Sequence, residues 1–399
     1  MSNTKMREKP RPLFSRNFAT LLVAQASFGY AFSSFLMLPK FLVTDLGAGP
    51  VEIGRVMAVY SMATIASMPV MGVMVDRFGR RVFMTVGALL MALASTAYVA
   101  VDDIGPLIYA LRGVQGCAFA MVFVGGATLT VDEAPPERLG QAIALFGLTM
   151  LAMNGVAAAS VEAIVTASGW PLAFLAAAAA AILSTVLSRA LRERRSAEVV
   201  TPANGLWLVS KRKPLRHLLV VSSTVGAAMS TMVTFHQPFA LERGIESVSG
   251  FFVAYAAAAI FVRVGLGHVI DRAGRRRVAV VSLFAYAAVV TAMARLDGSA
   301  VLALLGLGLG AAHGFSYPSL NSLAIDGVSI DDRGKVMALF QGAFHVGFAG
   351  AALGFGALAE VAGYPAIFFG GGACALVGLV VLAASPAGVA PGQAADGVW

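Results

Sequence analysis

One predicted helix of this apolar chain carries three polar residues that could do chemistry. His313, Tyr317 and Asn321 follow one another at intervals of four residues, so on a helix they form a single polar stripe. An imidazole titrates near neutral pH, and His313 could therefore carry a proton. A polar packing seam between helices is the alternative interpretation. His345 is a second, separate candidate for proton carriage.

Arg112 is another candidate, because it lies within the apolar run of a different predicted helix. A charged side chain inside a membrane is costly, so its presence indicates function by default. We expect Arg112 to face a central cavity or to pair with a polar group such as Gln25, and a structural bridge is the alternative. Gln115 lies three residues further on, on the same helix face. Tyr30, from the same predicted helix as Gln25, would add polar surface.

The elements that carry these residues are predicted to be membrane helices. Of the 399 residues, 58% are hydrophobic and 13% are charged, whereas a soluble protein has about 25% charged residues. The apolar runs are about 20 residues long, enough for a helix to cross a bilayer, and they lack the alternation of barrel strands. We predict an all-α polytopic membrane protein with twelve transmembrane helices, at about 18–42, 51–75, 82–101, 105–131, 139–163, 169–190, 217–241, 248–270, 278–295, 299–325, 335–361 and 364–385.

The charged residues indicate which side of the membrane each loop occupies. The net charge is +8, and basic residues gather in alternate loops, as the positive-inside rule requires. Both termini and the central loop are therefore predicted to be cytoplasmic, in a multi-pass protein of the cell inner membrane, and no nucleic acid partner is expected. The predicted divisions are a cytoplasmic N-terminus at 1–17, a six-helix bundle at 18–190, a basic linker at 191–216, a second bundle at 217–385 and a tail at 386–399.

A repeated loop indicates that the chain is a duplicated unit. The strings GVMVDRFGRR, at Gly72–Arg81, and GHVIDRAGRR, at Gly267–Arg276, are about 195 residues apart. Further pairs, including Asp132 with Asp326, keep an offset of about 194. Two parallel six-helix repeats are a known transporter arrangement, with the substrate site between them.

The charged residues of the two loops could bridge to acids at the ends of neighbouring helices and latch one side of the protein. Fixing the topology alone is the alternative role. The residues of this predicted gating motif are Gly72, Asp76, Arg77, Gly79, Arg80, Arg81, Asp132, Gly267, Asp271, Arg272, Gly274, Arg275 and Asp326.

The doubled loop resembles the signature that the major facilitator superfamily carries between its second and third helices and again between its eighth and ninth. The string LRGVQG, at Leu111–Gly116, resembles the Arg-containing motif of that family's fourth helix. The resemblance extends over about residues 18–385 and is closest in style to the drug:proton antiporter and sugar-efflux branch. It implies two pseudo-symmetric six-helix bundles, alternating access, gating by the loop motif, and a role for Arg112 in proton coupling or anion recognition.

Two departures from the antiporter pattern leave the coupling open. The first span contains no acidic residue, and the nearest acids are Asp45 and Glu52. The fifth span has AMNGVAAAS, at Ala152–Ser160, where the antiporter signature would place a Gly-Pro pair. The sequence favours a secondary transporter of a small organic solute, with efflux as the expected direction. Uptake of a metabolite is the alternative, and coupling to protons is a further possibility.

Other classes of function receive less support. Copper(I) import is an alternative because thioethers suit Cu(I), although methionine is also a common apolar filler; the residues concerned are Met68, Met71, Met74, Met229 and Met232. A non-transporting membrane sensor is a further alternative. No GxxxxGKS/T, HExxH or GxSxG string occurs, so no enzymatic activity is expected. The two cysteines lie in apolar runs, neither a cofactor nor a metal site is expected, and the protein is expected to be a monomer.

Overall fold

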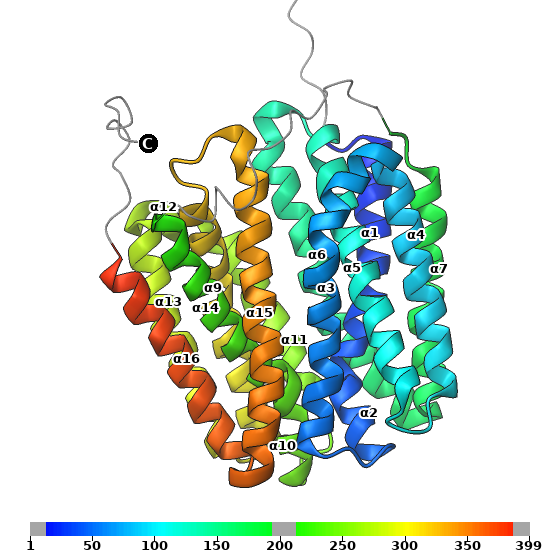
Figure 1. The fold of residues 1–399 in the computed structure, drawn as a ribbon, viewed down its shortest axis with the longest axis vertical. Helices are drawn as coiled ribbons and strands as arrows, with labels where there is room; N and C mark the ends of the chain where they lie inside the picture. The colour runs from blue at the N-terminus through cyan, green and yellow to red at the C-terminus, as the bar shows by residue number, and fades with distance from the viewer. Residues whose placement is uncertain (1–12, 194–212, 386–399) are drawn as a thin grey trace, which may run out of the picture.

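The computed structural model describes residues 13–193 and 213–385, which form helices and, within these ranges, no strand. The helices stand side by side in two groups, one from each half of the chain (Figure 1). The N-terminal half contains α1 (Arg16–Ser34), which continues through a short 3-10 turn into α2 (Leu38–Thr44), and then α3 (Pro50–Phe78), α4 (Arg80–Ala97), α5 (Pro106–Glu133), α6 (Leu139–Ser168) and α7 (Trp170–Ala190).

The C-terminal half has the corresponding succession of helices. A π-helical turn at Thr231–Phe235 joins its first two helices. The helices are α9 (Lys213–Ser230), α10 (His236–Glu242), α11 (Ser249–Gly265), α12 (Gly267–Ala273), α13 (Arg275–Ala292), α14 (Ser299–Ala324), α15 (Ile330–Ala362) and α16 (Tyr364–Ala384).

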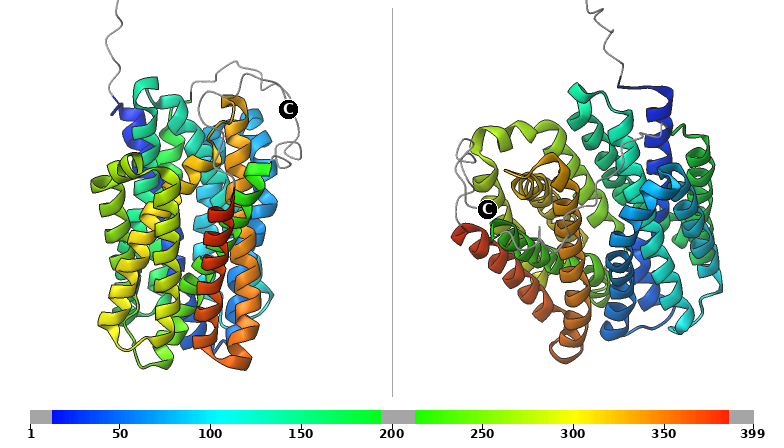
Figure 2. Two further views of the ribbon diagram at one scale, coloured as in Figure 1. Left: turned by 90° about the vertical axis from the view of Figure 1, so that its left-hand side faces the viewer. Right: turned by 45° about the horizontal axis from the view of Figure 1, so that its top comes forward.

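Both halves pack their helices in the same order, which is the structural form of the sequence repeat. In the N-terminal half α3 packs on α5, α5 on α4, α4 on α7, α7 on α1, and α1 on α6. In the C-terminal half α11, α14, α13, α16, α9 and α15 follow one another in the same way. The tilted view in Figure 2 shows the two bundles as separate groups. The predicted all-α fold of two pseudo-symmetric bundles is confirmed.

The number of spans is close to the prediction but not equal to it. Among the described residues, ten helices are long and apolar enough to cross a membrane, or eleven if α11 and α12, bent by 57° at their junction, form one span. The predicted second span at 51–75 lies within α3, which is 29 residues long. The predicted number of twelve spans is therefore not confirmed.

The two copies of the repeated loop form the same turn. Gly79, between α3 and α4, has a φ of 98°, and Gly274, between α12 and α13, has a φ of 87°. Residues with a side chain rarely adopt such a positive φ, so glycine fits here at low cost. We call the end of the bundle that carries these turns the motif end. The other end, which carries Lys40 and Glu162, is the distal end.

The two halves contact each other toward the distal end. Helix α3 packs on α15, and α6 packs on α11. A Cβ atom on Gly54 would lie 2.2 Å from the carbonyl oxygen of Ala352, so the backbones of α3 and α15 touch near the start of α3. Figure 1 shows α3 and α15 converging at this end and diverging toward the motif end. The protein is thus closed between its halves at the distal end.

Candidate functional site

A largely buried ion pair lies at the distal end, where the two halves meet. Lys40 Nζ, on α2, is 2.7 Å from Glu162 Oε1, on α6, and the two side chains are 14% and 11% exposed. Lys40 Nζ also donates a hydrogen bond to the backbone carbonyl of Glu246, in the other half, at 2.6 Å. The ammonium group therefore links its own half to the loop that precedes α11.

Glu162 holds the beginning of α11 through hydrogen bonds. It accepts from Ser247 Oγ at 2.9 Å, from the backbone N–H of Val248 at 2.9 Å and from that of Ser249 at 3.1 Å. A carboxylate is stabilised at a helix N-terminus because the free N–H groups and the helix dipole both favour negative charge. We call the Lys40–Glu162 pair with its bonds to residues 246–249 the distal latch.

The halves meet again near the middle of α3 and α15, at a cluster of aromatic rings. His345 Nδ1, on α15, lies 3.4 Å from Ser61 Oγ, on α3. The ring of His345 is 6.3 Å from that of Tyr60 and 6.4 Å from that of Phe119. Further rings of the N-terminal half, those of Phe32, Phe123 and Phe146, continue the cluster. We call the whole cluster the aromatic centre, and its members are Phe32, Tyr60, Phe119, Phe123, Phe146 and His345.

Arg112 is turned toward α3 rather than toward α1. It is 4% exposed, its Nε donates to the carbonyl of Val56 at 3.4 Å, and its Nη1 donates to Gln115 Oε1 at 3.0 Å. Its guanidinium lies 4.8 Å from the centroid of the Tyr60 ring. Gln25, the expected partner, is fully buried, and its amide has no hydrogen-bond partner in the described part of the chain. Arg112 thus packs against the aromatic centre through Tyr60.

His313 lies inside the C-terminal half. It is 8% exposed and stacks on Tyr317, with 5.4 Å between ring centroids, while the rings of Tyr255 and Tyr286 are 5.9 and 6.5 Å away. Neither His313 Nδ1 nor Asn321 Oδ1 has a hydrogen-bond partner among the described residues. His313 and Tyr317 line a small cavity of about 10 Å³, which is about the space for one water, together with Ser222, Val225, Ser316, Leu320, Phe340 and Phe344.

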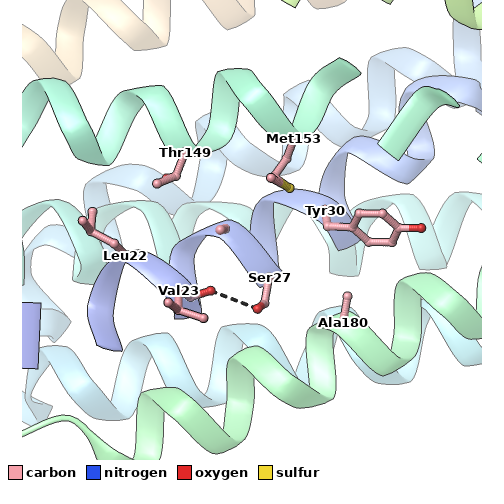
Figure 3. Close-up of a pocket in the computed structure, with 8 residues that line it drawn as sticks. Leu22, Val23, Ser27, Tyr30, Thr149, Met153 and Ala180 are labelled. Atoms are coloured by element: carbon pink, nitrogen blue, oxygen red, sulfur yellow. Dashed lines mark hydrogen bonds between the residues drawn. The ribbon is translucent and has the colours of Figure 1, made fainter. Parts of the chain in front are cut away.

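The structure therefore does not bring the predicted pathway residues to one place. Arg112 and Gln115 belong to the core of the N-terminal half, while His313, Tyr317 and Asn321 belong to the other half. Tyr30 hydrogen-bonds Ser160 through its hydroxyl, at 2.8 Å. It also lines a groove of about 570 Å³ whose lining residues belong to α1, α6 and α7 of the N-terminal half (Figure 3).

The predicted gating motif forms an ion pair in each half. Arg80, at the start of α4, pairs with Asp132, near the end of α5, and the side chains are 17% and 25% exposed. The equivalent pair, Arg275 with Asp326, is 4.0 Å apart, and its side chains are 48% and 58% exposed. The repeat is thus preserved in side-chain contacts, with the tighter and more buried pair in the N-terminal half.

A second pair of equivalent arginines caps the last helix of each half. Arg81 Nη1 donates to the carbonyl of Leu191, at 3.5 Å, just after α7. Arg276 Nη2 donates to the carbonyls of Leu382 and Ala383, at 3.0 and 3.1 Å, in the last turn of α16. A cation is favourable at a helix C-terminus because the last carbonyls lack partners within the helix.

The other motif residues contribute less to the described contacts. The guanidinium of Arg77 lies 5.5 Å from the ring of Phe78. Asp271 and Arg272 are exposed. The surroundings of Gly72 and of the Asp76 side chain lie outside the described part of the chain, so their predicted roles in the gating motif stay predictions.

His236, which follows two of the clustered methionines, belongs to the core. Its ring lies 4.3 Å from that of Phe251 and 5.0 Å from that of Phe252, and its Nδ1 contacts the carbonyl of Met232. Among the described residues, no group of three or more His, Cys, Asp and Glu side chains could hold a metal ion.

Several residues of the site were not among the sequence predictions. Lys40 and Glu162 are two of the few charged residues at the predicted outer ends of spans. Because charges are scarce there, this position was the feature of the sequence that could have identified them. Tyr60 and Ser61 carry no local signal, because the sequence does not reveal which face of α3 meets α15.

Comparison with known proteins supplies the family. The family description "Major Facilitator Superfamily" matches residues 19–272 and 245–396. The chain belongs to the major facilitator superfamily. The identification from the repeated loop is confirmed, and this major facilitator protein is a multi-pass membrane protein.

Sequence relatives of this major facilitator transporter include drug-resistance proteins. A segment covering 43% of the chain is 29% identical, over 181 residues, to the multidrug resistance protein B homolog of Mycobacterium tuberculosis. A segment covering 32% is 28% identical, over 127 residues, to multidrug resistance protein 3 of Bacillus subtilis. The matches cover only 32% and 24% of those two relatives. They support the drug-efflux branch suggested by the sequence.

Solved structures share the fold of this transporter over nearly its whole length. A mutant of the nucleoside transporter NupG matches with a TM-score of 0.77 at 14% identity, over 92% of this chain and 99% of that one. The human organic anion transporter MFSD10 (TETRAN) matches with a TM-score of 0.72 at 14% identity, with the same coverage of 92% and 99%. At this level of identity the similarity shows the fold alone.

Proposed function

We propose that this transporter exports an amphiphilic organic solute across the cell inner membrane by alternating access. The observation that carries the proposal is the contact of His345 with Ser61 and with the rings of Tyr60 and Phe119. Here the two halves meet at mid-helix, and the shared surface combines apolar rings with hydrogen-bonding groups. Such a surface suits a molecule with an apolar body and a few polar groups.

The charge distribution supports a cytoplasmic location for the motif end. Both copies of the loop motif contribute several arginines there, whereas the distal end has few basic residues. In this orientation both termini are cytoplasmic and the distal latch faces the outside. The structure then corresponds to a state closed toward the outside. Export requires the latch to break while the halves close at the motif end.

Efflux is supported by the names of the two multidrug resistance relatives. For coupling, we propose His345 as the proton carrier, because among the side-chain types of the aromatic centre only an imidazole ordinarily titrates near neutral pH. Protonation would place a charge between the two halves, where it can bias the equilibrium between states. The transporter acts as a monomer in this proposal, since one chain supplies both halves of the site.

Cellular accumulation of a fluorescent amphiphile, such as a rhodamine dye, tests the proposal. Cells that express the protein should hold less dye than cells that lack it. Phe119→Ala removes a ring of the aromatic centre and should abolish most of this difference. Phe369→Ala is the matched control, because Phe369, on α16, is 53% exposed and should have no effect.

Direction follows from the same measurement. Higher dye content in expressing cells would mean uptake and would contradict the proposed export. Equal dye content for a chemically varied set of probes, with the protein present in the membrane, would contradict transport of amphiphiles.

A further inference from the structure

We propose that Arg263 forms, with Tyr317, an anion-recognition subsite that binds the carboxylate of an organic anion. The inference rests on the proposed function and deepens it, because it specifies the chemical class of the polar group on the solute. The subsite lies in the C-terminal half, beside the aromatic centre.

Arg263 points into the bundle rather than toward lipid. Phe261 and Val264, its neighbours on α11, are 65% and 68% exposed and mark the outer face of that helix. At about 100° per residue, Arg263 lies on the opposite face. Its guanidinium is 5.3 Å from the centroid of the Tyr317 ring, on α14. A positive charge is thus fixed inside the C-terminal half.

One nitrogen of the half-buried Arg263 guanidinium has no partner among the residues that the structure describes. Arg263 Nε is buried without a hydrogen-bond partner in the described part of the chain. Arg112, by contrast, donates to the Val56 carbonyl and to Gln115. A buried charge is costly unless it is paired and hydrogen-bonded. Arg112 is therefore satisfied by the protein itself, whereas Arg263 keeps a buried Nε that can donate to an anionic ligand.

Further polar groups surround the same ring. Tyr317 Oη accepts a hydrogen bond from Gln341 Nε2 at 3.0 Å, which leaves its own hydrogen free to donate to a ligand. His313, stacked on Tyr317, is 92% buried and has an unpartnered Nδ1. Ser316 Oγ, fully buried, also lacks a partner among the described residues. Arg263, Tyr317 and His313 can together supply the donors that a carboxylate accepts.

The position of the subsite indicates an organic anion rather than a bare inorganic one. The small cavity beside Tyr317 is lined by Phe344, whose ring is 5.7 Å from that of His345 in the aromatic centre. A solute with its apolar body against the aromatic centre could thus direct a carboxylate toward Tyr317 and Arg263. The cavity holds space for about one water in this state.

Binding of salicylate to the purified full-length protein tests the inference, with the neutral salicylamide as a matched probe. The wild-type protein should bind salicylate more tightly than salicylamide. Arg263→Gln should weaken salicylate binding about tenfold or more, as expected for a lost hydrogen bond to a charged group. It should leave salicylamide binding unchanged. Arg295→Gln is the control, since Arg295 is exposed at the distal end.

A second variant covers the case in which Arg263→Gln does not fold. Tyr317→Phe keeps the ring under Arg263 and removes only the hydroxyl, so it should selectively weaken salicylate binding. Unchanged salicylate affinity in both folded variants would overturn the inference. So would equal affinity of the wild-type protein for both probes, or complete displacement of salicylate by an equal concentration of chloride.

The outcome is separable from that of the proposed export. The binding assay needs no transport, so salicylate selectivity that depends on Arg263 can be found even if cells expel no dye. Conversely, cells that expel a cationic dye while the purified protein ignores the charge of the probe would retain the proposed export and lose the anion subsite.

Discussion

Lys40 Nζ lies 2.7 Å from Glu162 Oε1, and the same carboxylate accepts the backbone N–H of Ser249, in the other half, at 3.1 Å. One carboxylate therefore neutralises a cation of its own half and caps a helix of the opposite half. Closure of the distal end depends on a helix cap that breaks when α11 moves away.

Glu162→Gln should destabilise this closure. The amide removes the charge that pairs with Lys40 and interacts with the dipole of α11, while it keeps the size of the side chain. Losing a partly buried charge pair of this kind should shift the equilibrium about tenfold toward the state open at the distal end. The reporter is Ser61→Cys, at a position 1% exposed. Its labelling by a membrane-impermeant maleimide, in a background without Cys117 and Cys374, should become faster.

Glu242→Gln serves as the control for this experiment. Glu242 is an exposed acid at the same end, on α10, and its replacement should leave the labelling rate unchanged. Equal labelling rates for Glu162→Gln and the unmodified background would show that the latch does not hold the distal end closed.

Gly54→Ala should prevent complete closure by steric means. The new methyl group would lie 2.2 Å from the Ala352 carbonyl oxygen, which is backbone and cannot turn aside. Transport should fall strongly, and labelling of Ser61→Cys should rise. The matched control is Gly113→Ala, also in a helix of the N-terminal half, where a Cβ atom would meet nothing within 4 Å. Wild-type transport by Gly54→Ala would be incompatible with the described packing of α3 on α15.

Arg112→Gln should lower the stability of the N-terminal half, with membrane insertion intact. The change removes the hydrogen bond from Arg112 Nε to the Val56 carbonyl and the cation over the Tyr60 ring. The free energy of unfolding should fall by about 2 kcal/mol, which should be visible as a lower melting temperature in detergent. Arg189→Gln, at an exposed site on α7, should melt like the wild-type protein. An unchanged melting temperature for Arg112→Gln would contradict its structural role.

The two motif ion pairs should differ in strength. Asp132→Asn should lower the free energy of unfolding by about 1 kcal/mol, because the Arg80 and Asp132 side chains are only 17% and 25% exposed. Asp326→Asn should leave the free energy of unfolding almost unchanged, because the side chains of its pair are about half exposed. Melting temperatures of the two variants compare them directly. A larger loss of stability for Asp326→Asn than for Asp132→Asn would contradict this order of strengths.

The fold could be predicted from the sequence because long apolar runs and a repeat at half-chain spacing leave few arrangements. The rotation of each helix about its axis could not. Helix α5 is apolar around most of its surface, so nothing local indicated that Arg112 would face α3 and leave Gln25 unpaired. For the same reason nothing local indicated that His313 would pack among tyrosines of its own half.

Contacts between the halves were beyond sequence reasoning for a different reason. Lys40 and Glu246 are 206 residues apart, and Glu162 and Ser249 are 87 apart. No periodicity relates residues on different helices of different bundles. The number of spans was hard to fix because α11 ends at Gly265 and the chain bends before α12, which a hydropathy pattern does not register.

Accumulation of a rhodamine dye in inverted membrane vesicles tests the central claim most directly. Vesicles that contain the protein should accumulate the dye above vesicles without it, and more so when a pH gradient is imposed, while vesicles with Phe119→Ala should resemble the empty ones. Accumulation by wild-type vesicles no greater than by empty vesicles, with the protein shown to be folded in the membrane, would contradict export through the aromatic centre.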